Sequence, residues 1–298
     1  MTSASKHARR PTLACEIAAD RVLAGRAADA GRMVEMASAR ELAPGTVLPD
    51  LMEPNLRDRA AVRQAIESAL GSIGGRSRDV IAILPDTAVR VVLLDFETLP
   101  AKLDEAEAVV RFRLKKSLPF DPAEARISYH AQTSGKGVRA VAAVVLNTVL
   151  EEYESAFRDA GYSPGMVMPS MLAALGAADA ERPTLVVKVD AHTISIAILE
   201  QEQLLLFRTL ENVRGVAITG DQLAEEVYPS VVFFQDTYNL NIERVYVAGL
   251  PEAGGAASAL KNQSGAQVEE LIAASQIGSS TGTVPRWRMA GVVGALIS

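Results

Sequence analysis

One strand pattern occurs twice in the chain, and this recurrence constrains the fold more than any other feature. Near the N-terminus, short apolar segments follow one another with turns between them, which is typical of an antiparallel meander. About 172 residues later the same order of segments returns. The recurrence predicts two similar lobes. The six segments are 12–19, 21–24, 32–37, 185–190, 194–199 and 204–208.

Helical patterns connect and follow these meanders. Between 57 and 73 apolar residues recur every three or four positions, which predicts an amphipathic helix ending at Gly74 and Gly75. A buried strand is expected directly afterwards, at 80–84. Further expectations are helices at 151–160, 171–178 and 220–239, a strand at 244–248, and a loop rich in glycine and alanine to about residue 257.

A separate unit lies between the two halves, at about 86–150. Its helix starts after Leu99 and Pro100 and stops at the two prolines within 118–122, because proline cannot continue the helical hydrogen-bond ladder. The expected strands of this unit are 89–94, 127–132 and 138–146. The order of elements is therefore strand, helix, strand, strand.

Composition limits the class of protein. Apolar residues make up 49% of the 298 residues and charged residues 22%, as in compact folded proteins. The net charge of −6 opposes binding to nucleic acid, because neutralising phosphates needs an excess of Lys and Arg. The single cysteine, Cys15, fits a reducing compartment, and three histidines far apart in sequence predict no metal site.

The sequence predicts neither a membrane span nor a signal peptide. The longest uninterrupted apolar run is 140–146, far shorter than the ~18 residues that a spanning helix needs. The basic start at 1–10 is not followed by an apolar stretch of the kind found in signal peptides. We therefore expect a cytoplasmic protein.

Two local motifs suggest chemistry that their context does not support. Residues 161–165 match the G-x-S-x-G nucleophile elbow of hydrolases, with Ser163 as the nucleophile. Pro164, however, has no N–H to offer to an oxyanion hole. We therefore favour a helix cap followed by a turn at these residues. Residues 134–137, Ser-Gly-Lys-Gly, lack the spacing of a phosphate loop and predict a hairpin turn.

Several strings of residues, together with the order of elements, resemble a known family. The strings are 80–85, 99–100, 116–122, 140–146 and 160–162. With them, the chain resembles the actin-like ATPase superfamily. More closely, it is similar to the PilM family of type IV pilus assembly proteins, which is similar to FtsA. The resemblance spans about residues 12–250.

This resemblance implies an α/β, actin-like (ribonuclease H-like) fold of two lobes, with an inserted strand-helix-strand-strand subdomain in lobe one. Lobe two is expected to be truncated, because the helix at 220–239 follows the strand at 204–208 almost directly. Little chain remains for the small subdomain that other members carry there. The expected ranges are a disordered tail at 1–11, lobe one at 12–84 and 151–182, the inserted subdomain at 85–150, and lobe two at 183–298.

The resemblance also implies three nucleotide-binding signatures, and the chain departs from each of them. The family uses D-x-G in the first phosphate hairpin, D-x-G-x-x-x-T in the second and consecutive glycines in the adenosine loop, where glycine lets the backbone approach the ligand. The corresponding residues here are Glu16 and Ala18, then Asp190 and His192, and then Gly249. We therefore expect no cofactor and no catalysis, with binding of ATP and magnesium as the alternative.

The function implied by the resemblance is that of a non-catalytic scaffold in the inner-membrane assembly platform of type IV pili. Members of the family bind the cytoplasmic N-terminal segment of the membrane protein PilN between the first lobe and the inserted subdomain. An extended peptide needs an apolar groove with polar groups at its rim. The candidate groove residues are Val80, Ile83, Leu99, Arg111, Leu118 and Phe120.

Two other functions remain open from the sequence. One is a nucleotide-binding actin-like ATPase, and the other is a cytoplasmic component of a type II secretion platform. In each scaffold hypothesis the protein lies at the cytoplasmic face of the inner membrane through its partner. Contacts with other platform proteins and self-association are also allowed by the resemblance.

Overall fold

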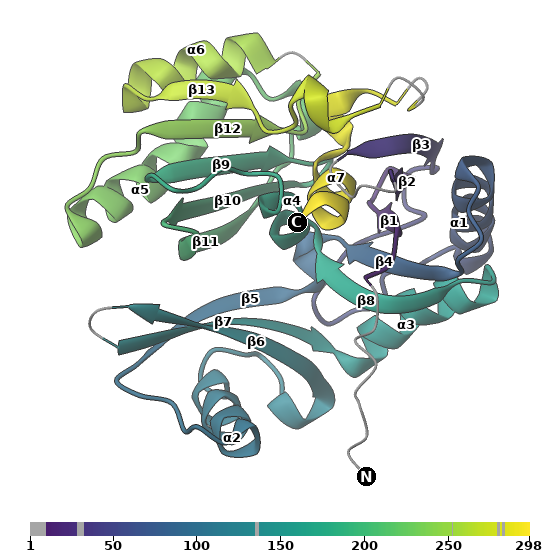
Figure 1. The fold of residues 1–298 in the computed structure, drawn as a ribbon, viewed down its shortest axis with the longest axis horizontal. Coiled ribbons are helices and arrows are strands. Elements are labelled where there is room, and N and C mark those ends of the chain that lie inside the picture. The colour runs from purple at the N-terminus through teal and green to yellow at the C-terminus, as the bar shows by residue number, and fades with distance from the viewer. Residues whose placement is uncertain (1–9, 29–32, 135–136, 252, 279–280, 282–283) are drawn as a thin grey trace.

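Two five-stranded sheets with equivalent strand order form the two lobes (Figure 1). The computed structural model describes residues 10–28, 33–134, 137–251, 253–278, 281 and 284–298. The first sheet, in the order β3-β2-β1-β4-β8, consists of β1 (Leu13–Ile17), β2 (Arg21–Ala27), β3 (Val34–Glu41), β4 (Asp79–Leu84) and β8 (Ser163–Pro169). The second, in the order β11-β10-β9-β12-β13, consists of β9 (Thr184–Val189), β10 (Thr193–Glu200), β11 (Gln203–Glu211), β12 (Arg244–Ala248) and β13 (Gln267–Glu270).

The strand directions in the two sheets are also equivalent. In the first sheet β1, β2 and β3 form an antiparallel meander, and β4 runs parallel to β1. In the second sheet β9, β10 and β11 form the same meander, and β12 runs parallel to β9. The prediction of two similar lobes is therefore confirmed. Of the predicted tail at 1–11, residues 1–9 lie outside the described residues.

Side chains alternate along β1 between two hydrophobic cores. The helices around this sheet are α1 (Arg59–Ile73), α3 (Asn147–Asp159), α4 (Ser170–Leu175) and α7 (Ala290–Ile297). Leu13, Cys15 and Ile17 belong to the core that includes buried residues of α1 and α3. Ala14 belongs to the other core, which includes residues of α4, α7 and the second lobe. Because both faces of the sheet are covered, every residue of β1 is buried.

The last helix of the chain, α7, crosses back to the first lobe. It contacts β1, β2 and α4, and it lies between the two sheets in Figure 1. Gly294 permits the close approach to α4, since a Cβ at this position would lie 2.1 Å from the carbonyl oxygen of Ala173. The range assigned to lobe two from the sequence thus ends in a helix that covers lobe one.

Lobe two continues from its meander directly into a long helix, α5 (Gly220–Tyr238). Only one turn of 3-10 helix, Gly215–Ala217, lies between β11 and α5. Thr219 begins α5 with a capping box, in which its hydroxyl accepts from the Gln222 N–H and the Gln222 side chain accepts from the Thr219 N–H. This short connection agrees with the predicted truncation of lobe two, because apart from that turn neither a strand nor a helix lies between residues 211 and 220.

The inserted subdomain consists of β5 (Arg90–Phe96), α2 (Leu103–Leu114), β6 (Ala125–Ser134) and β7 (Gly137–Leu146). Its antiparallel sheet has the order β5-β7-β6, and α2 packs on it through Val110 and Leu114. The predicted order of strand, helix, strand and strand is confirmed. At the end of the β6–β7 hairpin Ser134 pairs with Gly137, and residues 135–136 of the predicted turn lie outside the described residues.

Three local expectations were wrong or incomplete. A helix cap followed by a turn was expected at 161–165, but residues 163–169 form β8, because pairing with β4 overrides two prolines and a glycine at the sheet edge. A helix, α6 (Ala253–Ser264), begins within the expected loop. Gly220 of α5 permits its close packing, since a Cβ at Gly220 would lie 2.3 Å from the carbonyl oxygen of Gly255. Strand β13 was not predicted.

Ser163 begins a strand, whereas a nucleophile elbow holds its serine at a strand-to-helix turn. The rejection of that motif is thus consistent with the fold. Within the described parts of the chain, no helix combines the length and the apolar character needed to cross a membrane.

Candidate functional site

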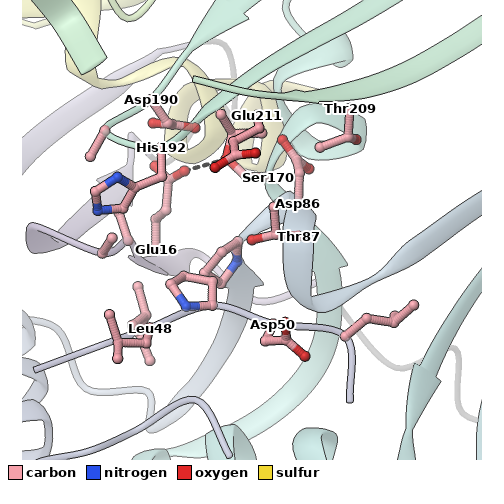
Figure 2. Close-up of a pocket in the computed structure, with 18 of the residues that line it drawn as sticks. Glu16, Leu48, Asp50, Asp86, Thr87, Ser170, Asp190, His192, Thr209 and Glu211 are labelled. Carbon is pink, nitrogen blue, oxygen red and sulfur yellow. Dashed lines mark hydrogen bonds between the residues drawn. The ribbon is translucent and has the colours of Figure 1, made fainter. Parts of the chain in front are cut away.

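A cleft of about 560 Å³ lies between the two lobes (Figure 2). The β1–β2 and β9–β10 turns contribute Ala18 and His192 to its lining. Leu48 and Asp50, from the loop between β3 and α1, lie on the opposite side from Asp190 in Figure 2. Of the predicted cleft residues, Glu16, Ala18, Asp190 and His192 line this space, whereas Gly249 does not.

The backbone of the two turns is already engaged in hydrogen bonds within each hairpin. The N–H of Ala18 donates to the carbonyl oxygen of Arg21 at 2.8 Å, and the N–H of Asp190 donates to that of Thr193 at 2.8 Å. A phosphate loop binds its ligand through N–H groups that have no partner in the protein. These two N–H groups are therefore not available to a phosphate.

A network of buried charges forms the floor of the cleft. Lys188, on β9, is only 3% exposed and pairs with Asp190, and its Nζ lies 3.8 Å from Oε1 of Glu16. Arg21, on β2, lies 3.4 Å from Asp190 and 2.7 Å from Asp20. The network thus joins the first hairpin of each lobe. Both cations are already paired with carboxylates of the protein.

The pKa values in this network follow from burial and pairing. Burial lowers the pKa of Lys188, but the attraction of Asp190 and Glu16 outweighs it, so the net pKa lies above the ordinary value. Burial raises the pKa of Asp190, but Lys188 and Arg21 outweigh it, and the net pKa is lowered. Lys188 and Asp190 are therefore both charged at neutral pH.

Asp86 is a second buried carboxyl group at the cleft. It follows β4 and accepts hydrogen bonds from the Met171 N–H at 2.8 Å and from the Ser195 hydroxyl at 2.7 Å. Ser195 belongs to β10 of the second lobe, so Asp86 connects the lobes. Burial raises the pKa of Asp86 to about 6, although Lys188 and both hydrogen bonds act to lower it.

The loop at 48–57 is held in place by Asn55, which is fully buried. The Asn55 side chain donates to the carbonyl oxygens of Asp50 and Glu53 and accepts from the N–H of Asp50 and from the Tyr153 hydroxyl. Its backbone N–H donates to Glu152 at 2.7 Å. A loop with this many internal hydrogen bonds is preorganised, and it presents Leu48 to the cleft.

The cleft residues do not fit ATP and magnesium. Six carboxylates and one arginine, Arg57, line the cleft. This excess of negative charge opposes the binding of a triphosphate. Gly249 serves packing, since a Cβ there would lie 1.7 Å from the Val189 carbonyl oxygen, and its N–H donates to the carbonyl oxygen of Trp287. Within the described residues, no three His, Cys, Asp or Glu side chains are placed to hold a metal ion. The six carboxylates are Glu16, Asp50, Glu53, Asp86, Asp190 and Glu211.

A second concave surface, which we call the α2–β6 groove, lies on the inserted subdomain. Its volume is about 510 Å³, and its lining includes Leu99, Leu103, Ala106 and residues 127–131. Strand β6 is an outer strand of its sheet, so one edge has no strand partner within the described chain. Unpaired edge groups beside an apolar groove can accept an extended peptide.

The predicted groove residues are not brought together at one surface. Val80 and Ile83 are fully buried in β4, which corrects that part of the prediction, because neither side chain reaches a surface. Leu99 lines the α2–β6 groove. The Arg111 side chain bonds to Glu107 and to the carbonyl oxygen of Pro122. Leu118 and Phe120 are partly buried against the core of the inserted subdomain.

Sequence reasoning missed three residues that organise the cleft. They are Arg21, Asp86 and Lys188. A lysine within the otherwise apolar segment 185–189 was the available signal, since a charge in a buried strand requires a partner. No comparable signal identified Asn55, because its role depends on side chains almost a hundred residues away, in α3.

The two matched sheets and the cleft between them define the class of fold as actin-like. Solved structures confirm it: a Bacteroides thetaiotaomicron protein with an actin-like ATPase fold and unknown function matches with a TM-score of 0.55 at 10% identity, covering 94% of this chain and 93% of that one. A PilM-PilN type IV pilus biogenesis complex matches with a TM-score of 0.80 at 20% identity, covering 97% of this chain and 98% of that one. The predicted likeness to PilM is confirmed as a likeness of fold.

The cytoplasmic domain of EpsL, an inner-membrane component of the type II secretion system of Vibrio cholerae, is a further match. Its TM-score is 0.55 at 11% identity, and the match covers 96% of this chain and 94% of that one. No protein-family model and no curated protein sequence matches the chain.

Proposed function

We propose that this protein is a non-catalytic scaffold of a type IV pilus inner-membrane platform, which binds the cytoplasmic N-terminal segment of a PilN-like membrane protein. The observation that carries the proposal is the α2–β6 groove, on a chain whose fold resembles that of a PilM-PilN complex over nearly its whole length. The peptide would place the protein at the cytoplasmic face of the inner membrane.

The groove suits an extended peptide for two physical reasons. The edge of β6 offers backbone groups in strand geometry along 127–131. Further along the strand, the carbonyl oxygen of Thr133 already accepts a hydrogen bond from the Gln203 side chain of lobe two. Leu103, which is 80% exposed, leaves an apolar side chain in water that a partner would cover. Alternate side chains of an added strand would face α2, so apolar residues at every second position would be favoured.

The test is calorimetric titration with a synthetic peptide of the N-terminal segment of a PilN-like protein encoded nearby. We expect micromolar or tighter binding. Leu103→Asp should weaken it at least about tenfold, because a carboxylate would be buried in an apolar contact. Val213→Asp is the matched control, since Val213 is also 80% exposed but lies on lobe two. Absence of binding heat, or equal loss in both variants, would refute the proposal.

The likeness to EpsL supports a second candidate, a cytoplasmic component of a type II secretion platform. The same groove would then receive the cytoplasmic segment of a secretion-platform protein. Titration with N-terminal peptides from both kinds of system separates the two candidates. Only the peptide of the correct partner should bind with an affinity that Leu103→Asp lowers.

A further inference from the structure

The inter-lobe cleft combines a surplus of negative charge with a buried acceptor that lacks a partner. Six carboxylates line it against Arg57, and the cations beneath them, Arg21 and Lys188, are already paired. Glu16, which is 2% exposed, accepts from the Ser170 hydroxyl through Oε1. Its Oε2 is buried and has no hydrogen-bond partner within the described chain.

The position of Glu16 connects this acceptor to the cleft. Its carboxylate lies among the lining side chains, close to those of Ser170 and Asp190, in Figure 2. A buried carboxylate oxygen without a donor costs free energy, because the water that would solvate it has been removed. Lys188, whose Nζ lies 3.8 Å from Oε1, offsets only part of the Glu16 charge, and a cationic donor that entered the cleft beside Asp190 would offset more of it.

One wall of the cleft is apolar and rigid. Leu48, Pro49 and Leu51 line it, and Leu48 remains 43% exposed. Asn55 holds the loop in this form from beneath, so the exposed apolar side chains do not result from a loosely packed segment. An occupant that covered Leu48 would gain roughly 25 cal/mol for each Å² of apolar surface removed from water.

These features select the chemistry of the occupant. A triphosphate would be repelled by the carboxylates, and no three described side chains are placed to hold a metal ion. An inorganic cation would not use the apolar wall. The geometry points to a basic peptide segment, with a Lys or Arg side chain among Asp190 and Glu211 and an apolar side chain against Leu48. This site is separate from the α2–β6 groove and does not depend on the proposed function.

Fluorescence polarisation with the labelled octapeptide Gly-Ser-Leu-Lys-Leu-Lys-Ser-Gly tests the inference on the full chain. The same peptide with Glu in place of Lys is the ligand control. We expect saturable binding of the basic peptide and no binding of the acidic one. The affinity of the basic peptide should fall as the salt concentration rises, because salt screens exposed charges. Failure of the basic peptide to saturate, or equal binding of the acidic peptide, would overturn the inference.

Variants locate the binding. Glu53 and Glu211 are exposed and have no ion pair within the described chain, so E53Q with E211Q should preserve the fold and weaken binding about tenfold. The matched control is E97Q with E225Q, the same change of charge at exposed positions away from the cleft. Equal effects of the two double variants would show nonspecific attraction and refute the cleft as the site.

Two further measurements separate this site from its alternatives. Leu48→Ser should also weaken the basic peptide, because it removes apolar contact, whereas Leu103→Asp should leave its affinity unchanged. Loss of binding in Leu103→Asp but not in E53Q with E211Q would assign the peptide to the α2–β6 groove and overturn the inference. Displacement of the peptide by an equal concentration of magnesium-ATP would show that the cleft prefers nucleotide, with the same consequence.

Discussion

Replacing Asp86 by Asn gives a quantitative test of the electrostatics between the lobes. Asp86 is 4% exposed and accepts hydrogen bonds from the Met171 N–H and the Ser195 hydroxyl. An asparagine can satisfy the same partners, because its oxygen can accept from Met171 and its amide can donate to the hydroxyl oxygen of Ser195. The variant should therefore fold while losing the titratable group.

The magnitude follows from the raised pKa of Asp86. Its folded value is about 6, whereas an unfolded aspartate has a pKa of about 3.9. The protonated form is thus favoured by folding, so this contribution to stability is fully present below about pH 3.9 and is lost as pH rises through about 6. Between pH 5 and pH 8 the free energy of unfolding of the wild-type protein should therefore fall by about 1.4 kcal/mol relative to that of the variant.

The assay is urea unfolding of both proteins at several pH values from 5 to 8. The free energy of unfolding of the wild type minus that of Asp86→Asn should fall by about 1.4 kcal/mol over this range. Other titrating groups cancel in the difference, to the extent that the substitution leaves them unchanged. Asp159→Asn, which removes an exposed carboxyl group on α3, is the control and should show little slope. A flat difference for Asp86→Asn, or one that rises with pH, would refute the reasoning.

Two other predictions concern the cleft. Lys188→Met removes the buried cation beside Glu16 and leaves Asp190 with Arg21 alone, so we expect the free energy of unfolding in urea at neutral pH to fall by roughly 3–5 kcal/mol. Lys115→Met, at an exposed position, is the control, and a loss equal to that of the control would contradict the assigned network. Magnesium-ATP up to millimolar concentration should leave the melting temperature unchanged, because a ligand stabilises only the state it binds. A magnesium-dependent rise would favour the ATPase alternative.

Much of the fold could be predicted because its signals are local. The helix at 57–73 follows from apolar spacing, and the structure places α1 at Arg59–Ile73. The failures occurred where tertiary contacts override local preference. Strand β8 contains two prolines and a glycine but is held by β4, and α6 begins near two glycines but packs closely on α5. Local propensity is a weak guide at such positions.

The candidate sites were less predictable than the fold. Val80 and Ile83 were expected at a groove from their place in the chain order, but strands covered on both faces bury every side chain. Glu16, near the end of β1, and Asp190 and His192, in the β9–β10 turn, were expected at the cleft and do line it, because strand ends and the turns between meander strands lie at the ends of the sheets. Their ionic partners could not be inferred from spacing.

By itself, the sequence indicated the two lobes and the inserted subdomain, since strand periodicity and turn residues are properties of neighbouring residues. The shortened second lobe followed from the resemblance to the actin-like superfamily. Only the tertiary structure decided which charges meet. Lys188 and Glu16 lie 172 residues apart in sequence but 3.8 Å apart in space. The outer position of β6 in its sheet and the acidic cleft likewise arise from how sheets and lobes assemble. Electrostatic interactions and edge pairing depend on distance through space, and short-range sequence patterns carry little information about such distances.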